Sequence, residues 1–162
     1  MRYLWVMATN KFLKGAVGHW AGESKLHLSW LEDETKRVQK GPSELHVDLD
    51  ESGAFATVTY WWTYEGKKQE GVMTVVCDEK RKKCFLGWVD AWHMNYDVMR
   101  FEGELKEESV GGFGKYFVGE GEPEWGWTIE VLDAGQQLKL RMENVTPGGE
   151  KEWAVEAIYS RA

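Results

Sequence analysis

The segment 54–65 reads AFATVTYWWTYE and carries the longest strand pattern in the chain. Successive side chains of a β-strand point to opposite faces, so residues of even number share one face. That face holds an apolar and aromatic set, namely Ala56, Val58, Tyr60, Trp62 and Tyr64. The other face is mostly threonine. A strand with one aromatic and one polar face indicates a sheet that covers a core.

The same alternation recurs from residue 19 to the end of the chain, in about ten runs joined by hairpin-length connections. Two of these runs are expected at Cys84 to Met94 and Phe113 to Val118, and a short helix near Asn10 to Val17 with Thr9 or Asn10 as its cap. We predict an all-β fold, a closed up-and-down antiparallel barrel of about ten strands, because closure removes unpaired strand edges. Residues 1–162 would form one domain, with 1–17 as an N-terminal segment and 18–162 as the barrel.

The charge balance limits the kinds of partner. The chain contains 20 Lys and Arg residues and 27 Asp and Glu residues, which gives a net charge of −7. An acidic chain lacks the basic surface that phosphate neutralisation requires, so we expect neither nucleic acid nor membrane as partner. The apolar stretch Tyr3 to Ala8 is too short for a signal peptide or a membrane span, which favours a cytoplasmic location.

Cys77 and Cys84 flank a hairpin turn, and we expect two reduced thiols that face each other.

The ten tryptophans suggest a lined cavity rather than plain packing, because a buried indole N–H needs a partner. A barrel of this width also holds more space than its own side chains fill. The candidate ligand-binding residues are Tyr60, Trp62, Trp88, Asp90, Trp92, Trp127 and Arg141. Asp90 shares a strand face with two indoles, so we expect it to point inward. There it would either pair with an arginine such as Arg141 or Arg100, or contact the ligand.

Several motifs resemble those of a known superfamily. The opening Gly18-x-Trp20-x-Gly22-Glu23 looks like the first-strand signature of calycin barrels, which are the lipocalins, fatty-acid-binding proteins and nitrobindins. The later pattern is similar to an uncharacterised, mostly bacterial lipocalin-like family known only as a domain of unknown function. That similarity rests on the hairpin around Asp78, Trp88-Val89-Asp90, Thr146-Pro147-Gly148-Gly149-Glu150 and Glu156-Ala157-Ile158-Tyr159-Ser160-Arg161.

The resemblance implies a closed barrel with an internal apolar site and no assigned chemistry. It also implies that Arg161 packs over Trp20 as a structural contact that seals one end, outside the binding site. Nitrobindin-like barrels bind heme through a histidine late in the chain, and the last histidine here is His93. We expect His93 to be a partly exposed or hydrogen-bonded strand histidine rather than an axial ligand, and we predict no cofactor and no metal site.

These observations favour a protein that binds a small apolar or aromatic molecule inside a Trp-rich barrel, with a homodimer left open. The alternative is a small-molecule enzyme of the isomerase, cyclase or lyase type. Its acid–base set would be Asp90 with Tyr60 or His93. A third reading is an interaction protein whose barrel interior is filled with side chains.

Overall fold

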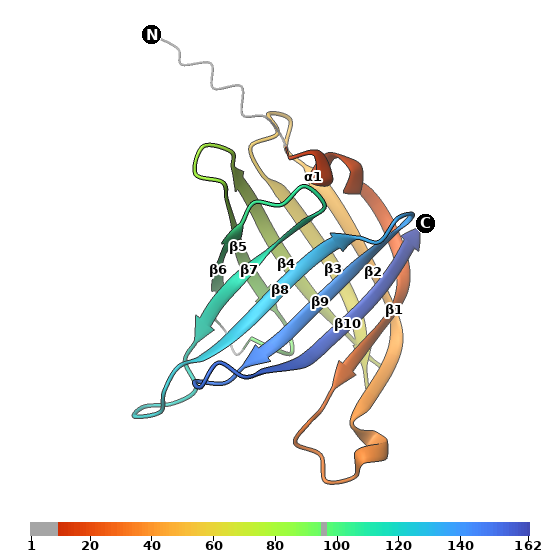
Figure 1. Ribbon diagram of the computed structural model, residues 1–162. Coiled ribbons are helices and arrows are strands. Elements are labelled where there is room, and N and C mark those ends of the chain that lie inside the picture. The colour runs from red at the N-terminus through yellow and green to blue at the C-terminus, as the bar shows by residue number, and fades with distance from the viewer. Residues whose placement is uncertain (1–9, 95–96) are drawn as a thin grey trace.

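The computed structural model describes residues 10–94 and 97–162 as a closed antiparallel barrel of ten strands with one short α-helix (Figure 1). This confirms the predicted fold class. The stretch Tyr3 to Ala8 and the alternative helix cap Thr9 lie outside the described residues. Asn10 caps the helix, because its side-chain oxygen accepts a hydrogen bond from the backbone N–H of Leu13 at 3.1 Å.

The elements follow one another with short connections. They are α1 (Lys11–Ala16), β1 (Gly18–His27), a 3₁₀ turn η1 (Glu34–Lys36), β2 (Val38–Leu49), β3 (Ala56–Tyr64), β4 (Lys67–Asp78), β5 (Lys83–Asp90), β6 (Met99–Glu104), β7 (Ser109–Tyr116), β8 (Trp125–Asp133), β9 (Gln137–Val145) and β10 (Lys151–Arg161).

Each strand pairs with its neighbours in sequence, and β1 pairs with β10 to close the barrel. At this seam Trp20 lies opposite Arg161, and Gly22 lies opposite Tyr159. A Cβ atom at Gly22 would collide with the carbonyl oxygen of Ile158, so glycine is what allows the first and last strands to come together there. The helix α1 lies across one end of the barrel, which we call the α1 end (Figure 1). The opposite end, where β5 stops at Asp90, is called the Asp90 end.

The barrel interior is built from one face of each strand, as the alternation in 54–65 predicts. Val58, Tyr60 and Trp62 are buried, whereas Trp61 of the other face is only half-buried. The buried set is almost entirely apolar, and Asp90 is the one buried carboxylate among the described residues. The interior is therefore a hydrophobic core with one charged group near one end.

Two strands differ from the sequence expectation. The predicted run Cys84 to Met94 stops at Asp90, and residues 91–93 form a turn. Strand β7 covers Ser109–Tyr116 instead of the predicted run Phe113 to Val118, so Gly111 and Gly112 lie within the sheet. A Cβ at Gly112 would lie 2.7 Å from the carbonyl carbon of Glu102, so the glycine lets β6 and β7 approach closely.

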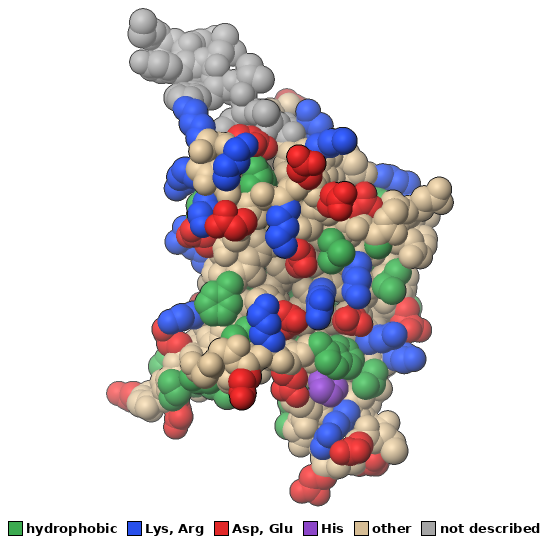
Figure 2. Space-filling model, viewed as in Figure 1, with side chains coloured by type: hydrophobic (Ala, Val, Ile, Leu, Met, Phe, Trp, Pro, Cys, Tyr) green, Lys and Arg blue, Asp and Glu red, His purple; other side chains and the backbone are tan. Residues whose placement is uncertain are grey.

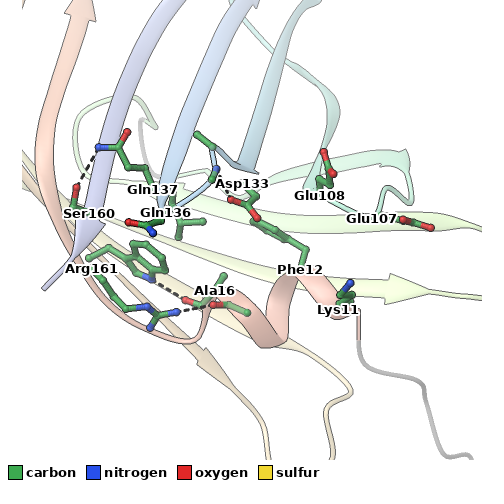
Figure 3. Close-up of a pocket in the computed structure, with 15 residues that line it drawn as sticks. Lys11, Phe12, Ala16, Glu107, Glu108, Asp133, Gln136, Gln137, Ser160 and Arg161 are labelled. Atoms are coloured by element: carbon green, nitrogen blue, oxygen red, sulfur yellow. Dashed lines mark hydrogen bonds between the residues drawn. The ribbon is translucent and has the colours of Figure 1, made fainter.

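The α1 end is closed by the contact that the resemblance implied. The guanidinium of Arg161 lies 4.4 Å from the ring centre of Trp20 and donates to the carbonyl oxygens of Val17 and Gly15 at 2.9 and 2.7 Å. The Trp20 indole N–H donates to the carbonyl oxygen of Ala16 at 2.8 Å. Figure 3 shows Arg161 beside the last turn of α1, next to a cavity of about 980 Å³ with a mixed polar lining. The polar groups of Trp20 and Arg161 are thus engaged in holding α1.

The outer surface carries charges of both signs. Figure 2 shows acidic and basic side chains interspersed over the visible face. Within the described part of the chain, no helix is long and apolar enough to cross a membrane. Cys77 and Cys84 are free, buried and directly opposite each other on β4 and β5, with 4.0 Å between the sulfur atoms, as the hairpin predicts.

Candidate functional site

The carboxylate of Asp90 is the centre of a buried hydrogen-bond network at the end of β5. Its Oδ2 atom accepts from the Tyr60 hydroxyl at 2.7 Å and from the Trp62 indole N–H at 3.3 Å. Its Oδ1 atom accepts from the backbone N–H groups of Trp92 and His93 at 2.9 and 2.8 Å. The Nδ1 atom of the His93 ring also lies 3.0 Å from Oδ1. The inward position expected for Asp90 is confirmed, and its charge is met by five donors.

The local sequence explains the geometry of this turn. An Asp side chain can accept hydrogen bonds from backbone N–H groups two and three residues later, which competes with continuation of a strand. Asp90 does this with Trp92 and His93, and its carbonyl accepts from the Met94 N–H at 3.1 Å. The strand therefore ends at Asp90, and the turn brings His93 back beside the carboxylate. The i, i+3 spacing Asp-x-x-His supplies the ring nitrogen that contacts the carboxylate.

The structure corrects the expectation of an arginine partner for Asp90. Arg141 is exposed on the outside of the barrel, where its guanidinium lies 3.1 Å from the carboxylate of Glu143. Arg100 is also exposed and lies over the ring of Phe85. Both arginines occupy strand positions whose parity points outward, so neither can reach the interior.

The network changes the acidity of its members. Burial alone would raise the pKa of Asp90, but the hydrogen bonds from His93, the charge of its ring when protonated, and the hydrogen bond from Tyr60 outweigh burial and hold the pKa at about 2. Burial and the neighbouring Asp90 charge raise the pKa of the Tyr60 phenol well above its ordinary value. At neutral pH the site thus holds an ionised carboxylate and a neutral phenol.

His93 presents an unused nitrogen. A carboxylate only accepts hydrogen bonds, so the Nδ1 atom that contacts Asp90 carries the hydrogen and the neutral ring keeps a lone pair on Nε2. That Nε2 atom is buried and has no hydrogen-bond partner. The His93 side chain is only 9% exposed, because four indole rings surround it. Their centres lie 4.8 to 5.8 Å from the imidazole centre, and they belong to Trp62, Trp88, Trp92 and Trp127.

A cavity of about 460 Å³ lies at the Asp90 end. It is lined by Trp88, His93, Met94, Asp97, Met99, Tyr116, Phe117, Val118 and Trp127. The rings of Trp88 and Trp127 stack with their centres 6.0 Å apart. The Trp127 indole N–H is buried and, like His93 Nε2, has no partner. On its other side, His93 borders a space of only about 10 Å³.

The structure therefore divides the candidate residues that the sequence grouped together. Trp88 and Trp127 line the 460 Å³ cavity, whereas Tyr60, Trp62 and Asp90 border the 10 Å³ space and pack as core. Trp92 lines neither space, because it lies in the turn after β5 and packs against Trp30, Trp62 and Tyr64. Arg141 lies outside the barrel. The expected single cavity shared by Tyr60, Trp62, Trp88, Asp90 and Trp92 is largely filled by its own side chains.

Several lining residues were not among the candidates. The i, i+3 spacing of Asp90 and His93 would have marked His93 as a partner of Asp90 if the strand had been predicted to end at Asp90. Met94, Asp97, Phe117 and Val118 come from connections between strands, and their sequences carry no pattern that marks a cavity. The consecutive pairing of β5 to β8 places the β5–β6 and β7–β8 connections side by side at the Asp90 end.

Heme, which the nitrobindin resemblance raises, can be tested against this lining. His93 Nε2 could serve as an axial ligand, but the carboxylates of heme would need cationic or other donor groups nearby. Among the described residues that line the cavity there is no Lys or Arg, and Asp97 adds a negative charge. The lining therefore fits an uncharged molecule better than heme.

The fold and the site together define a closed ten-stranded β-barrel with an aromatic cavity near one end. Comparison of the sequence with family models then assigns the chain: it belongs to the family described as "Protein of unknown function (DUF1579)", whose model matches residues 7–161.

A solved structure shares the fold. The crystal structure of Rv2717c from M. tuberculosis is similar with a TM-score of 0.63 and 13% sequence identity, over 96% of this chain and 98% of that chain. At this identity the likeness concerns the fold alone. No curated protein matches the sequence.

Proposed function

We propose that the protein binds an uncharged apolar or aromatic small molecule in the 460 Å³ cavity at the Asp90 end, in the manner of lipocalin-like barrels. The observation that carries the proposal is this cavity, walled by the stacked indoles of Trp88 and Trp127. Its volume lies in the range of about 300–1,000 Å³ that is typical of small-molecule sites. The aromatic side chains in the lining favour aromatic or other planar ligands.

The charges near the cavity support an uncharged ligand. Asp97 belongs to the lining, and the ionised Asp90 lies behind His93. An anionic ligand such as a fatty-acid carboxylate would be repelled by both groups, and the described lining supplies no cation to pair with it. Arg161 does not supply this cation, because it holds α1 at the other end of the barrel.

Filling the mouth of the cavity should weaken binding. Val118 is 45% exposed and lines the cavity, so Val118→Trp can place an indole in the space without disturbing the core. We expect the neutral naphthalene dye prodan to bind the wild-type protein at one saturable site, with a blue shift of its emission. The affinity of Val118→Trp should be at least about tenfold lower, equivalent to about 1.4 kcal/mol.

The matched control is Val72→Trp, because Val72 is 38% exposed on β4 and does not line the cavity. This variant should bind prodan as the wild-type protein does. Equal affinities of the two variants would show that the dye binds elsewhere and would overturn the assignment of the site.

A second candidate function is acid–base catalysis on the bound molecule, which the Asp90–His93 pair favours. Asp90 orients the imidazole through Nδ1 and leaves its Nε2 atom without a partner, in a ring that lines the cavity, an arrangement typical of a general base. Nε2 would take a proton from the carbon next to a ketone carbonyl. The electron pair of the broken C–H bond would form an enolate, to whose oxygen the Trp127 N–H could donate.

Deuterium exchange tests this second candidate. With 2-tetralone, an uncharged aromatic ketone, in deuterated water, we expect the wild-type protein to speed exchange at the carbon next to the carbonyl. By NMR, His93→Phe should give only the rate seen with an unrelated protein at equal concentration. The same rate with wild-type protein and His93→Phe would rule out His93 as the base and leave ligand binding alone.

A further inference from the structure

Two buried polar atoms in the described structure lack hydrogen-bond partners and belong to residues of the same cavity wall. They are His93 Nε2 and Trp127 Nε1. Both are shielded from solvent, so bulk water does not supply the missing bonds. Leaving a buried donor or acceptor unpaired lowers stability, and such groups in native proteins usually have a specific partner.

The two atoms have complementary hydrogen-bonding roles. An indole nitrogen can only donate. In the neutral His93 ring Nε2 is an acceptor, because the carboxylate of Asp90, 3.0 Å from Nδ1, holds the ring hydrogen there. The centres of the two rings are 5.6 Å apart. A partner that satisfies both atoms must therefore donate one hydrogen bond and accept another through a small group.

We infer that the ligand of this cavity carries a hydroxyl group, as a phenol or an alcohol. Its O–H donates to His93 Nε2 and its oxygen accepts from the Trp127 N–H, while its apolar body packs on Trp88 and Met99. Because both atoms are shielded, the His93 or Trp127 ring turns slightly to admit the group, a side-chain movement on the nanosecond scale or slower. The inference rests on the proposed function and specifies the ligand class of that same site.

Other polar groups satisfy the pair less well. A ketone or an ether accepts from Trp127 but leaves Nε2 unpaired. A carboxylate also only accepts, and it would add a charge beside Asp97 and Asp90. An ammonium group donates but cannot accept from the indole. A hydroxyl is small and uncharged and does both through one oxygen atom.

Three probes that share the naphthalene ring system separate the contributions of the two hydrogen bonds in a calorimetric titration. Naphthalene has no polar group, 2-methoxynaphthalene has an acceptor only, and 2-naphthol has a donor and an acceptor. For the wild-type protein we expect 2-naphthol to bind about tenfold more tightly than 2-methoxynaphthalene, since one hydrogen bond to a buried acceptor contributes about that factor. The titration is repeated with Trp127→Phe, which keeps an aromatic wall and removes only the N–H, and with His93→Phe.

The two substitutions should change different ratios of probe affinity. His93→Phe should abolish the preference for 2-naphthol over 2-methoxynaphthalene. Trp127→Phe should keep that preference but remove any advantage of 2-methoxynaphthalene over naphthalene. Because His93→Phe removes a donor from Asp90, its fold is checked by circular dichroism, and Trp127→Phe supplies an independent result if it does not fold.

The outcomes distinguish this inference from the function on which it rests. If all three probes bind the wild-type protein equally, the hydroxyl inference is wrong and the apolar site stands; this is also the result expected if the two nitrogen atoms pair with each other. If none of the probes binds, the proposed function itself is wrong. A naphthol preference that survives in both variants would place the hydroxyl elsewhere and overturn the inference.

Discussion

Replacing Asp90 by Asn is expected to lower the free energy of unfolding by about 3–5 kcal/mol, because two hydrogen bonds to an ionised group, each contributing about 1.5–3 kcal/mol, lose their acceptor. The carboxylate accepts five hydrogen bonds, from Tyr60, Trp62, Trp92 and, twice, His93. An Asn side chain offers one acceptor oxygen and one NH₂ donor, so at least two of these donors would face another donor. Urea unfolding followed by tryptophan fluorescence measures the loss.

Asp48→Asn serves as the control for this substitution. Asp48 is also a strand carboxylate beside a histidine, 2.9 Å from His46 Nε2, but its side chain is 67% exposed. Its replacement should change stability by no more than about 0.5 kcal/mol. If Asp90→Asn were as mild as the control, the carboxylate could not be the group that organises this end of the barrel.

The same carboxylate predicts a pH dependence. The pKa of Asp90 is about 2 in the folded protein, below its ordinary value of 3.8. A lowered folded-state pKa means that the unfolded chain takes up the proton first as pH falls. The stabilisation is therefore complete above about pH 4 and is lost as pH falls toward about 2. The difference in unfolding free energy between wild-type protein and Asp90→Asn should shrink by about 2 kcal/mol across this window. A difference that stays constant there would contradict the lowered pKa.

Replacing Trp20 by Ala should also lower the free energy of unfolding by about 3–5 kcal/mol. The indole is 95% buried, contacts Arg161 at 4.4 Å, and donates to the carbonyl oxygen of Ala16. Its removal leaves a cavity beneath α1 and takes away the ring over which the Arg161 guanidinium lies. Thermal unfolding by circular dichroism measures the effect, and an unchanged melting temperature would count against Trp20 as the seal of the α1 end.

Trp20→Phe separates the ring from its N–H group. This variant keeps most of the apolar contact and loses one hydrogen bond, so it should cost about 1 kcal/mol. Neither variant should alter the relative affinities for the naphthalene probes, because Trp20 lines the cavity at the α1 end and the proposed site lies at the Asp90 end. A changed probe preference in Trp20→Phe would show that the two ends are coupled.

Much of the architecture could be read from side-chain alternation. Parity alone places Tyr60, Trp62, Trp88 and Asp90 inside, because a strand residue has only two faces to choose between. The strand number, the cap at Asn10 and the facing cysteines follow from equally local patterns. The contact between Trp20 and Arg161 came from a family resemblance and is present in the structure.

The sequence by itself thus determined which side chains enter the barrel, while the tertiary structure alone decided which of them pack solidly and which border open space. Trp88 and Trp127 are 39 positions apart, and their stacking depends on how far each strand is displaced along its neighbour as the barrel closes. The partner of Asp90 likewise depends on a turn. The carboxylate accepts hydrogen bonds from the N–H groups of Trp92 and His93, so the strand ends there and the imidazole lies beside the carboxylate. Alternation describes a continuing strand, so it could not locate a site that depends on where the strand stops.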